Sequence, residues 1–225
     1  MPVVSVHIWL RVGSAYENAD QSGVAHFLEH LLFKGAGSHG VGEAVAQVEA
    51  LGGEINAWTS FESTVLHATV PAGRELAVIR LLGEMAYQPH LDPIELERER
   101  KVVLEEIRGA LDSPGQVLAD RQRARAWGPH PYGAPVLGRV DSVSRLSRDS
   151  IQAFHHAYYR PGNAIVVVAG PADPTAVLAE LRRSMVDPQG AVERSPRKGV
   201  PHVVTPGSFC FDGGFEDTTV EVAFR

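Results

Sequence analysis

Residues 23–35, with the sequence GVAHFLEHLLFKG, restrict the fold of this chain more than any other segment. Their apolar residues recur at helical spacing, so we predict a helix that begins after Ser22 as its N-cap. Three polar residues, His26, Glu29 and His30, interrupt the apolar pattern within little more than one helical turn. A fold that buries this helix must therefore also provide for these three side chains.

The two histidines have the spacing of a metal-binding pair. Residues four apart lie only about 40° from each other around a helix, so the imidazoles of His26 and His30 can converge on one point. Glu29 projects close to that point. Two neutral nitrogen ligands beside a carboxylate that can accept a proton are typical of zinc hydrolases, and His-x-x-Glu-His is the inverted zincin motif. The alternative is two partly buried structural histidines and a surface glutamate.

A catalytic zinc ion usually takes three protein ligands, so another element must supply the third. Residues 95–114, ELERERKVVLEEIRGALDSP, predict a helix rich in carboxylates. Glu99 and Glu106 are seven residues apart and share nearly the same face, whereas Glu105 points about 100° away from Glu106. Spacing alone does not choose among these three glutamates, and such residues are most often solvated.

The composition excludes several other classes of protein. In 225 residues, 44% are apolar and 21% charged, as in ordinary globular proteins. The net charge is −6 without a long basic run, which argues against nucleic-acid binding. Neither a transmembrane segment nor a signal peptide is recognisable. Cys210 is the only cysteine, so an internal disulfide is excluded. We expect a cytoplasmic protein, or a periplasmic one if the natural N-terminus is clipped.

The other elements follow from periodicity and turn residues. We predict four strands, the last of them buried, over residues 3–12, 54–60, 63–70 and 163–170. We predict helices over residues 23–34, 41–51, 73–87, 93–111, 114–127, 147–158 and 174–185. A Gly/Pro-rich surface loop is predicted over residues 128–140.

Three segments, HFLEHLLFKG, INAWTSFESTVLHATV and ERERKVVLEEIRGALDSP, resemble the pitrilysin family of zinc metallopeptidases, which includes insulin-degrading enzyme and mitochondrial processing peptidase. They agree with the family in order and spacing. The similarity extends from WLRVGSAYEN, through HPYGAPVLG and YYRPGNAIVVVAG, to the closing VEVAFR, and so covers essentially the whole chain. It implies an α+β fold with a mainly antiparallel sheet and helices packed on one face, like a mitochondrial processing peptidase domain.

The resemblance assigns roles to five residues of the predicted centre. It implies that His26 and His30 bind one zinc ion per chain and that Glu29 is the general base. Glu106, which follows His30 by 76 residues, matches the family's third zinc ligand. Glu99 matches an acidic residue beside the metal and is expected to support a ligand or the reacting water.

Asn56 and Ala57 match the Asn-Ala pair on the edge strand along which the family's substrates lie. A peptide added as a strand beside residues 54–58 would pair through main-chain hydrogen bonds, which gives loose sequence specificity. We therefore expect the substrate to be an extended peptide or an unfolded segment of a protein.

The resemblance also implies that the enzyme has a second half. We predict a zinc-peptidase N-terminal catalytic domain over residues 1–186, a connector over 187–214, and over 215–225 the start of a strand that leads into a missing C-terminal half. Family members close two similar halves around the peptide, so a homologous second half-domain or partner subunit is expected.

The predicted function is that of a zinc-dependent endopeptidase, although the isolated chain is expected to need a second half for activity. One alternative is a non-catalytic or half-enzyme subunit that acts as partner or scaffold in a two-chain peptidase. Another is a binding module whose histidines are structural. Metal content and peptidase activity distinguish these alternatives.

Overall fold

A computed structural model describes residues 2–185 together with residues 207, 209, 210, 214 and 220. Most of the predicted connector at 187–214 and of the predicted strand start at 215–225 therefore lies outside the described residues. In the part of the chain that is described, no helix combines the length and the apolar character needed to cross a membrane.

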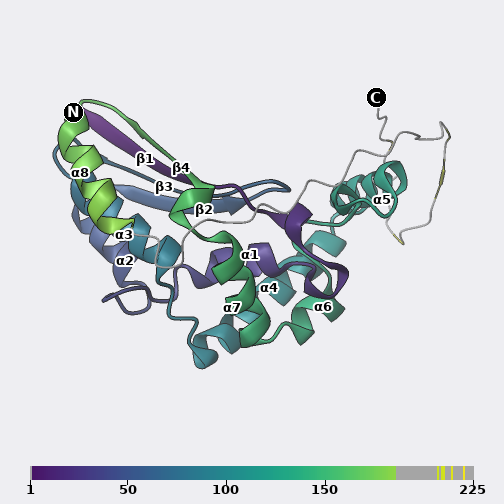
Figure 1. Ribbon diagram of the computed structural model, residues 1–225. Helices are drawn as coiled ribbons and strands as arrows, with labels where there is room; N and C mark the ends of the chain where they lie inside the picture. The colour runs from purple at the N-terminus through teal and green to yellow at the C-terminus, as the bar shows by residue number, and fades with distance from the viewer. Residues whose placement is uncertain (1, 186–206, 208, 211–213, 215–219, 221–225) are drawn as a thin grey trace.

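Four strands form one sheet in the order β2-β3-β1-β4. All of their pairings are antiparallel, and a short turn over residues 60–63 joins β2 to β3. The strand bounds are β1 Val3–Leu10, β2 Glu54–Thr59, β3 Thr64–Pro71 and β4 Ala164–Ala169. The helices lie on one side of this sheet (Figure 1), which confirms the predicted α+β class.

The helices begin and end close to the predicted positions. Their bounds are α1 Val24–Leu31, α2 Glu43–Ala50, α3 Glu75–Tyr87, α4 Pro93–Leu111, α5 Pro114–Trp127, α6 Val140–Arg145, α7 Arg148–Tyr158 and α8 Pro174–Ser184. The starts of α4 and α8 were clear because Asp92 and Asp173 cap them and proline occupies the first helical position. The six-residue α6 has no counterpart among the predicted helices.

The two faces of the sheet differ in burial. Along β1, Val4, Val6, Ile8 and Leu10 are completely buried on the face that the helices cover. Trp9 points to the other face and is 36% exposed. The prediction that residues 163–170 form a buried strand is wrong, because β4 is an edge strand and presents alternate residues to the uncovered face.

Helix α1, which carries His26 and His30, is deeply buried. Phe27 and Leu28 are completely buried, and the helix packs against α4, α7 and β2. Its amphipathic pattern therefore places the apolar residues in the core and leaves His30 and Glu29 at the boundary toward α4 and β2. These contacts determine what the polar residues of α1 meet.

The start of α1 differs from the prediction. Ser22 does not cap the helix; the N-cap is Gly23, with a φ of 93° that favours glycine. The carboxyl group of Glu17 caps the helix instead, because its two oxygens accept hydrogen bonds from the N–H groups of Gly23 and Ala25, at 2.8 and 2.9 Å. Gly138 packs directly on Gly23, where a β-carbon on either glycine would collide with backbone atoms. The helix that carries the histidines thus has a start fixed by distant residues.

Candidate metal centre

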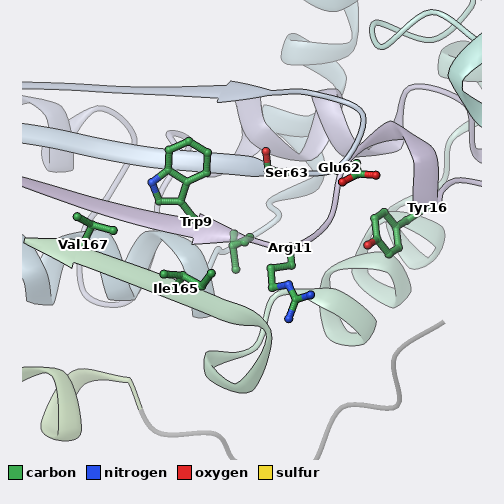
Figure 2. A pocket seen from close by; sticks show the side chains of 8 residues that line it. Trp9, Arg11, Tyr16, Glu62, Ser63, Ile165 and Val167 are labelled. Carbon is green, nitrogen blue, oxygen red and sulfur yellow. The ribbon is translucent and has the colours of Figure 1, made fainter. Parts of the chain in front are cut away.

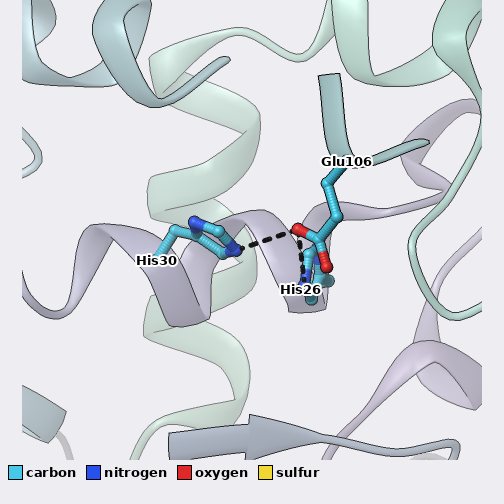
Figure 3. Close-up of side chains that lie close together, drawn as sticks. All are labelled: His26, His30 and Glu106. Carbon is cyan, nitrogen blue, oxygen red and sulfur yellow. Dashed lines mark ion pairs between the residues drawn. The ribbon is translucent and has the colours of Figure 1, made fainter. Parts of the chain in front are cut away.

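The structure brings His26, His30 and Glu106 together. The Nε2 atoms of the two histidines lie 3.6 and 3.5 Å from Oε2 of Glu106. Figure 3 shows both imidazoles of α1 turned toward this carboxylate, which α4 supplies. Among the described residues, these three form the one group of histidine, cysteine and acidic side chains able to hold a metal ion, with candidate ligand atoms within 4.8 Å of one another.

The two distances from the histidine nitrogens to Glu106 fit shared zinc ligation better than direct hydrogen bonds. Both exceed the usual range for hydrogen bonds between nitrogen and oxygen. Ligand atoms about 2.1 Å from a tetrahedral zinc ion lie about 3.4 Å from one another, close to what is seen here. Two imidazoles and one carboxylate also form a ligand set that leaves a coordination position open, as catalytic zinc sites do.

Burial supports the neutral form of the first histidine. Burial, together with the neighbouring His30, lowers the pKa of His26 to about 4. A zinc ligand must present an unprotonated nitrogen, so a low pKa favours binding at neutral pH. Nδ1 of His26 is buried, and no hydrogen-bond partner for it is found in the described part of the chain.

The three glutamates of α4 that spacing could not separate have different surroundings. Glu105 is mostly solvent-exposed and pairs with Arg108. Glu106 faces the two histidines. Glu99 lies one heptad before Glu106 and is buried, with Oε2 placed 3.2 Å from Nδ1 of His30. The crossing of α1 and α4 thus puts Glu106 at the candidate ligand position and Glu99 behind His30.

Glu29 lies between α1 and the end of β2. One of its carboxylate oxygens is buried, and no hydrogen-bond partner for it is found among the described residues. Burial raises the pKa of Glu29, while a hydrogen bond with Thr59 and the nearby His30 lower it. A carboxyl group with a raised pKa beside a candidate metal centre has the properties of a general base. No local pattern in the sequence pointed to Thr59.

Asn56 and Ala57 lie on β2, which is an edge of the sheet. The Asn56 side chain accepts a hydrogen bond from the N–H of Ala57 at 2.8 Å. This N–H therefore donates to a side chain and not to β3, and a carbonyl oxygen of an added strand could accept its hydrogen bond instead. The structure thus places both predicted residues on an edge that can accept a peptide strand.

Three further histidines of the chain lie away from this cluster. His155 is buried and donates a hydrogen bond from Nε2 to the carbonyl oxygen of Ala86 at 2.9 Å. His7 and His67 face each other across β1 and β3 with stacked rings. None of them contributes to the cluster of His26, His30 and Glu106.

A separate hollow of about 280 Å³ lies at the ends of β1 and β4 on the uncovered face of the sheet. Figure 2 shows Trp9, Ile165 and Val167 along its apolar side, with Arg11 and Glu62 toward its charged end. Because Trp9 points away from the helices, this hollow and the candidate metal centre lie on different faces of the sheet. It has no residue in common with the candidate centre.

Two family models match this chain in succession. Residues 1–139 match the model described as insulinase, peptidase family M16, and residues 145–225 match the peptidase M16 inactive domain. The chain belongs to peptidase family M16. The second match begins before β4, which pairs with β1, so the four-stranded sheet of this M16 chain combines strands from both matched regions.

Relatives and solved structures agree with this family. An uncharacterised zinc protease of Mycobacterium tuberculosis is 37% identical over 201 residues, which are 88% of this M16 chain and 46% of that protein. The crystal structure of a protease from Helicobacter pylori aligns with a TM-score of 0.84 and 31% identity, over 89% of this chain and 49% of that one. Pitrilysin shares the fold, with a TM-score of 0.74 and 21% identity over 89% of this chain and 22% of its own. The chain therefore spans about half the length of its mycobacterial relative.

Proposed function

We propose that this chain is the metal-bearing part of a zinc endopeptidase, with His26, His30 and Glu106 as zinc ligands and Glu29 as general base. The observation that carries the proposal is the convergence of the three candidate ligand atoms within 4.8 Å of one another, with both histidine nitrogens 3.5–3.6 Å from Glu106 Oε2. The relatives named zinc proteases support the choice of metal. One ion per chain is the proposed stoichiometry.

Zinc held by these three residues would polarise the carbonyl group of the scissile peptide bond and acidify the attacking water. Glu29 accepts a proton from that water and later donates it to the amine that leaves. Its burial suits the first step, because a raised pKa makes the carboxylate a stronger acceptor of that proton. The bond with Thr59 ties this carboxyl group to the strand beside which the substrate would lie.

The proposed substrate is an extended peptide that adds to the free edge of β2. Its main chain would replace the internal hydrogen bond from Ala57 to the Asn56 side chain. Such pairing depends mainly on the peptide backbone, so unfolded protein segments of varied sequence would be accepted. A folded protein would have to expose a strand before it could bind.

We further propose that a second M16 half completes the enzyme. The chain covers 46% of its mycobacterial relative and 49% of the Helicobacter pylori protease. The candidate metal centre is also open, since the Glu106 side chain is 44% exposed. The alternative function is a non-catalytic or half-enzyme subunit that acts as partner or scaffold in a two-chain peptidase, and it rests on the same two observations.

The test measures zinc content and hydrolysis of a quenched fluorescent peptide library by the chain and by Glu29→Gln. Hydrolysis is followed without and with a second M16 half supplied in trans. We expect one zinc ion per chain in both proteins and at least about a 100-fold lower rate for Glu29→Gln. Zinc without hydrolysis in either condition would favour the subunit alternative, and absence of zinc after reconstitution would refute the proposed centre.

A further inference from the structure

Lys34 lies just beyond the end of α1, four residues after His30. Its Nζ atom is 2.8 Å from Oε1 of Glu99, and the other carboxylate oxygen, Oε2, is 3.2 Å from Nδ1 of His30. The three side chains therefore form a continuous series that leads from the surface to a candidate zinc ligand. At the far side of the imidazole, Nε2 of His30 faces Glu106.

The Glu99 carboxylate lies between two donors. The Lys34 ammonium binds one oxygen, and the N–H at Nδ1 of His30 donates to the other. With both oxygens occupied, the plane of the carboxylate cannot rotate without losing one bond. The orientation of Glu99 in turn favours the tautomer of His30 that carries its proton on Nδ1, which leaves the lone pair of Nε2 for the candidate metal.

Burial makes the cation necessary for this arrangement. The side chain of Glu99 is only 9% exposed, and its neighbours on α4, Leu96 and Val103, belong to the hydrophobic core. A buried carboxylate is costly unless charged or hydrogen-bonding groups compensate it. Lys34 supplies that compensation while its own side chain is 28% exposed, so its stem reaches inward from the surface.

We propose that Lys34 is a positioning residue of the metal centre and acts through Glu99 on the tautomer and orientation of His30. This inference rests on the proposed zinc centre, and it assigns a role to a residue that touches neither the candidate metal nor the substrate. The lysine follows from the structure because its partner Glu99 is 65 residues away in the sequence.

The experiment compares Lys34→Met, Lys34→Arg and, as a matched control, Lys101→Met, in which an exposed lysine of α4 is replaced. Zinc affinity is measured by competition with a chromophoric chelator. The tautomer of His30 is read from ¹⁵N chemical shifts of the metal-free chain, assigned with a His30→Gln sample. Thermal unfolding monitored by circular dichroism checks that each variant folds.

We expect Lys34→Met to bind zinc about 10-fold more weakly, at the lower end of the roughly 10–100-fold losses seen for supporting partners of metal ligands. Its His30 should show a smaller fraction of the Nδ1–H tautomer. Lys34→Arg retains the cation and should stay within about 3-fold of the parent chain, and Lys101→Met should match the parent in both readouts.

Unchanged zinc affinity and an unchanged His30 tautomer in a folded Lys34→Met chain would overturn the inference. Equal losses in Lys34→Met and Lys34→Arg would also overturn it, because the cation would then not be the active feature. If the parent chain binds no zinc, the proposed function fails, yet the tautomer comparison in the metal-free chains still decides the role of Lys34.

Discussion

The assignment of the third ligand can be tested by comparing two neighbouring glutamates. Glu106 faces both histidines, whereas Glu105 points to solvent and pairs only with Arg108 on the same helix. Changing each to glutamine alters the same charge by the same amount, at adjacent positions of one helix. We expect Glu106→Gln to abolish tight zinc binding and Glu105→Gln to leave it intact.

The magnitudes separate the two variants clearly. Loss of the exposed Glu105 pair should change the free energy of unfolding by at most about 0.5 kcal/mol. Free zinc at 100 times its dissociation constant stabilises a folded binding site by about 2.7 kcal/mol, which raises the melting temperature of a chain of this size by roughly 5–10 °C. If Glu106→Gln weakens binding 100-fold, the same zinc concentration contributes only about 0.4 kcal/mol, or roughly 1 °C.

The assay is thermal unfolding with and without a buffered concentration of free zinc, combined with metal analysis of the dialysed proteins. The parent chain and Glu105→Gln should show the full zinc-dependent shift and one zinc ion per chain. Glu106→Gln should show almost none of that shift. A full shift in Glu106→Gln, or loss of the shift in Glu105→Gln, would refute the ligand assignment made from the geometry.

Three further predictions concern stability, the first two of them in the metal-free chain. Burial lowers the pKa of His155 to about 4, so between pH 6.5 and 4 the unfolded state binds a proton that the folded state does not. The free energy of unfolding should therefore fall by about 3 kcal/mol as the pH falls through this range. His155→Gln should remove this fall in a pH series of urea denaturation curves. Burial raises the pKa of Glu17 to about 8, so the contribution of this group to stability is fully present below about pH 4.5. The free energy of unfolding should fall by roughly 3–5 kcal/mol as the pH rises from there through 8. Glu17→Gln should remove this dependence on pH. Gly138→Ala would place a β-carbon 2.5 Å from the α-carbon of Gly23, at a backbone φ of 80°. We expect more than about 1 kcal/mol of destabilisation in urea denaturation and weaker zinc binding in zinc-dependent thermal unfolding. An unaffected Gly138→Ala chain would show that the start of α1 adapts.

Much of the fold could be predicted because many elements carry local signals. Asp92 and Pro93 begin α4, and the strands on either side of residues 60–63 read as a hairpin without further information. The errors occur where contacts with a distant part of the chain determine the local structure. The strand at 163–170 is as apolar as a central strand, yet its place at the edge of the sheet exposes alternate residues, because sheet order is not encoded in the strand itself.

In the candidate site, too, local spacing predicts some features and contacts between distant parts of the chain determine the others. The spacing of His26 and His30 predicted convergence on one point, and the structure places both Nε2 atoms near one carboxylate oxygen. Spacing could not choose the third glutamate, because the choice depends on how α4 crosses α1. The choice of Glu106 came from resemblance to a family, and the geometry now provides a physical reason for it that is independent of that resemblance.

The contacts at the two ends of α1 explain how a helix of eight residues can hold the candidate ligands His26 and His30 in place. At its start, the side chain of Glu17 accepts hydrogen bonds from two backbone N–H groups that would otherwise lack partners. Just after its end, Lys34 and Glu99 form an ion pair that also reaches His30. A helix this short is unstable alone, so its orientation must come from such contacts and from the burial of its apolar face. The motif therefore supplies two of the three candidate ligand atoms, while residues outside it determine whether those atoms point to the same place.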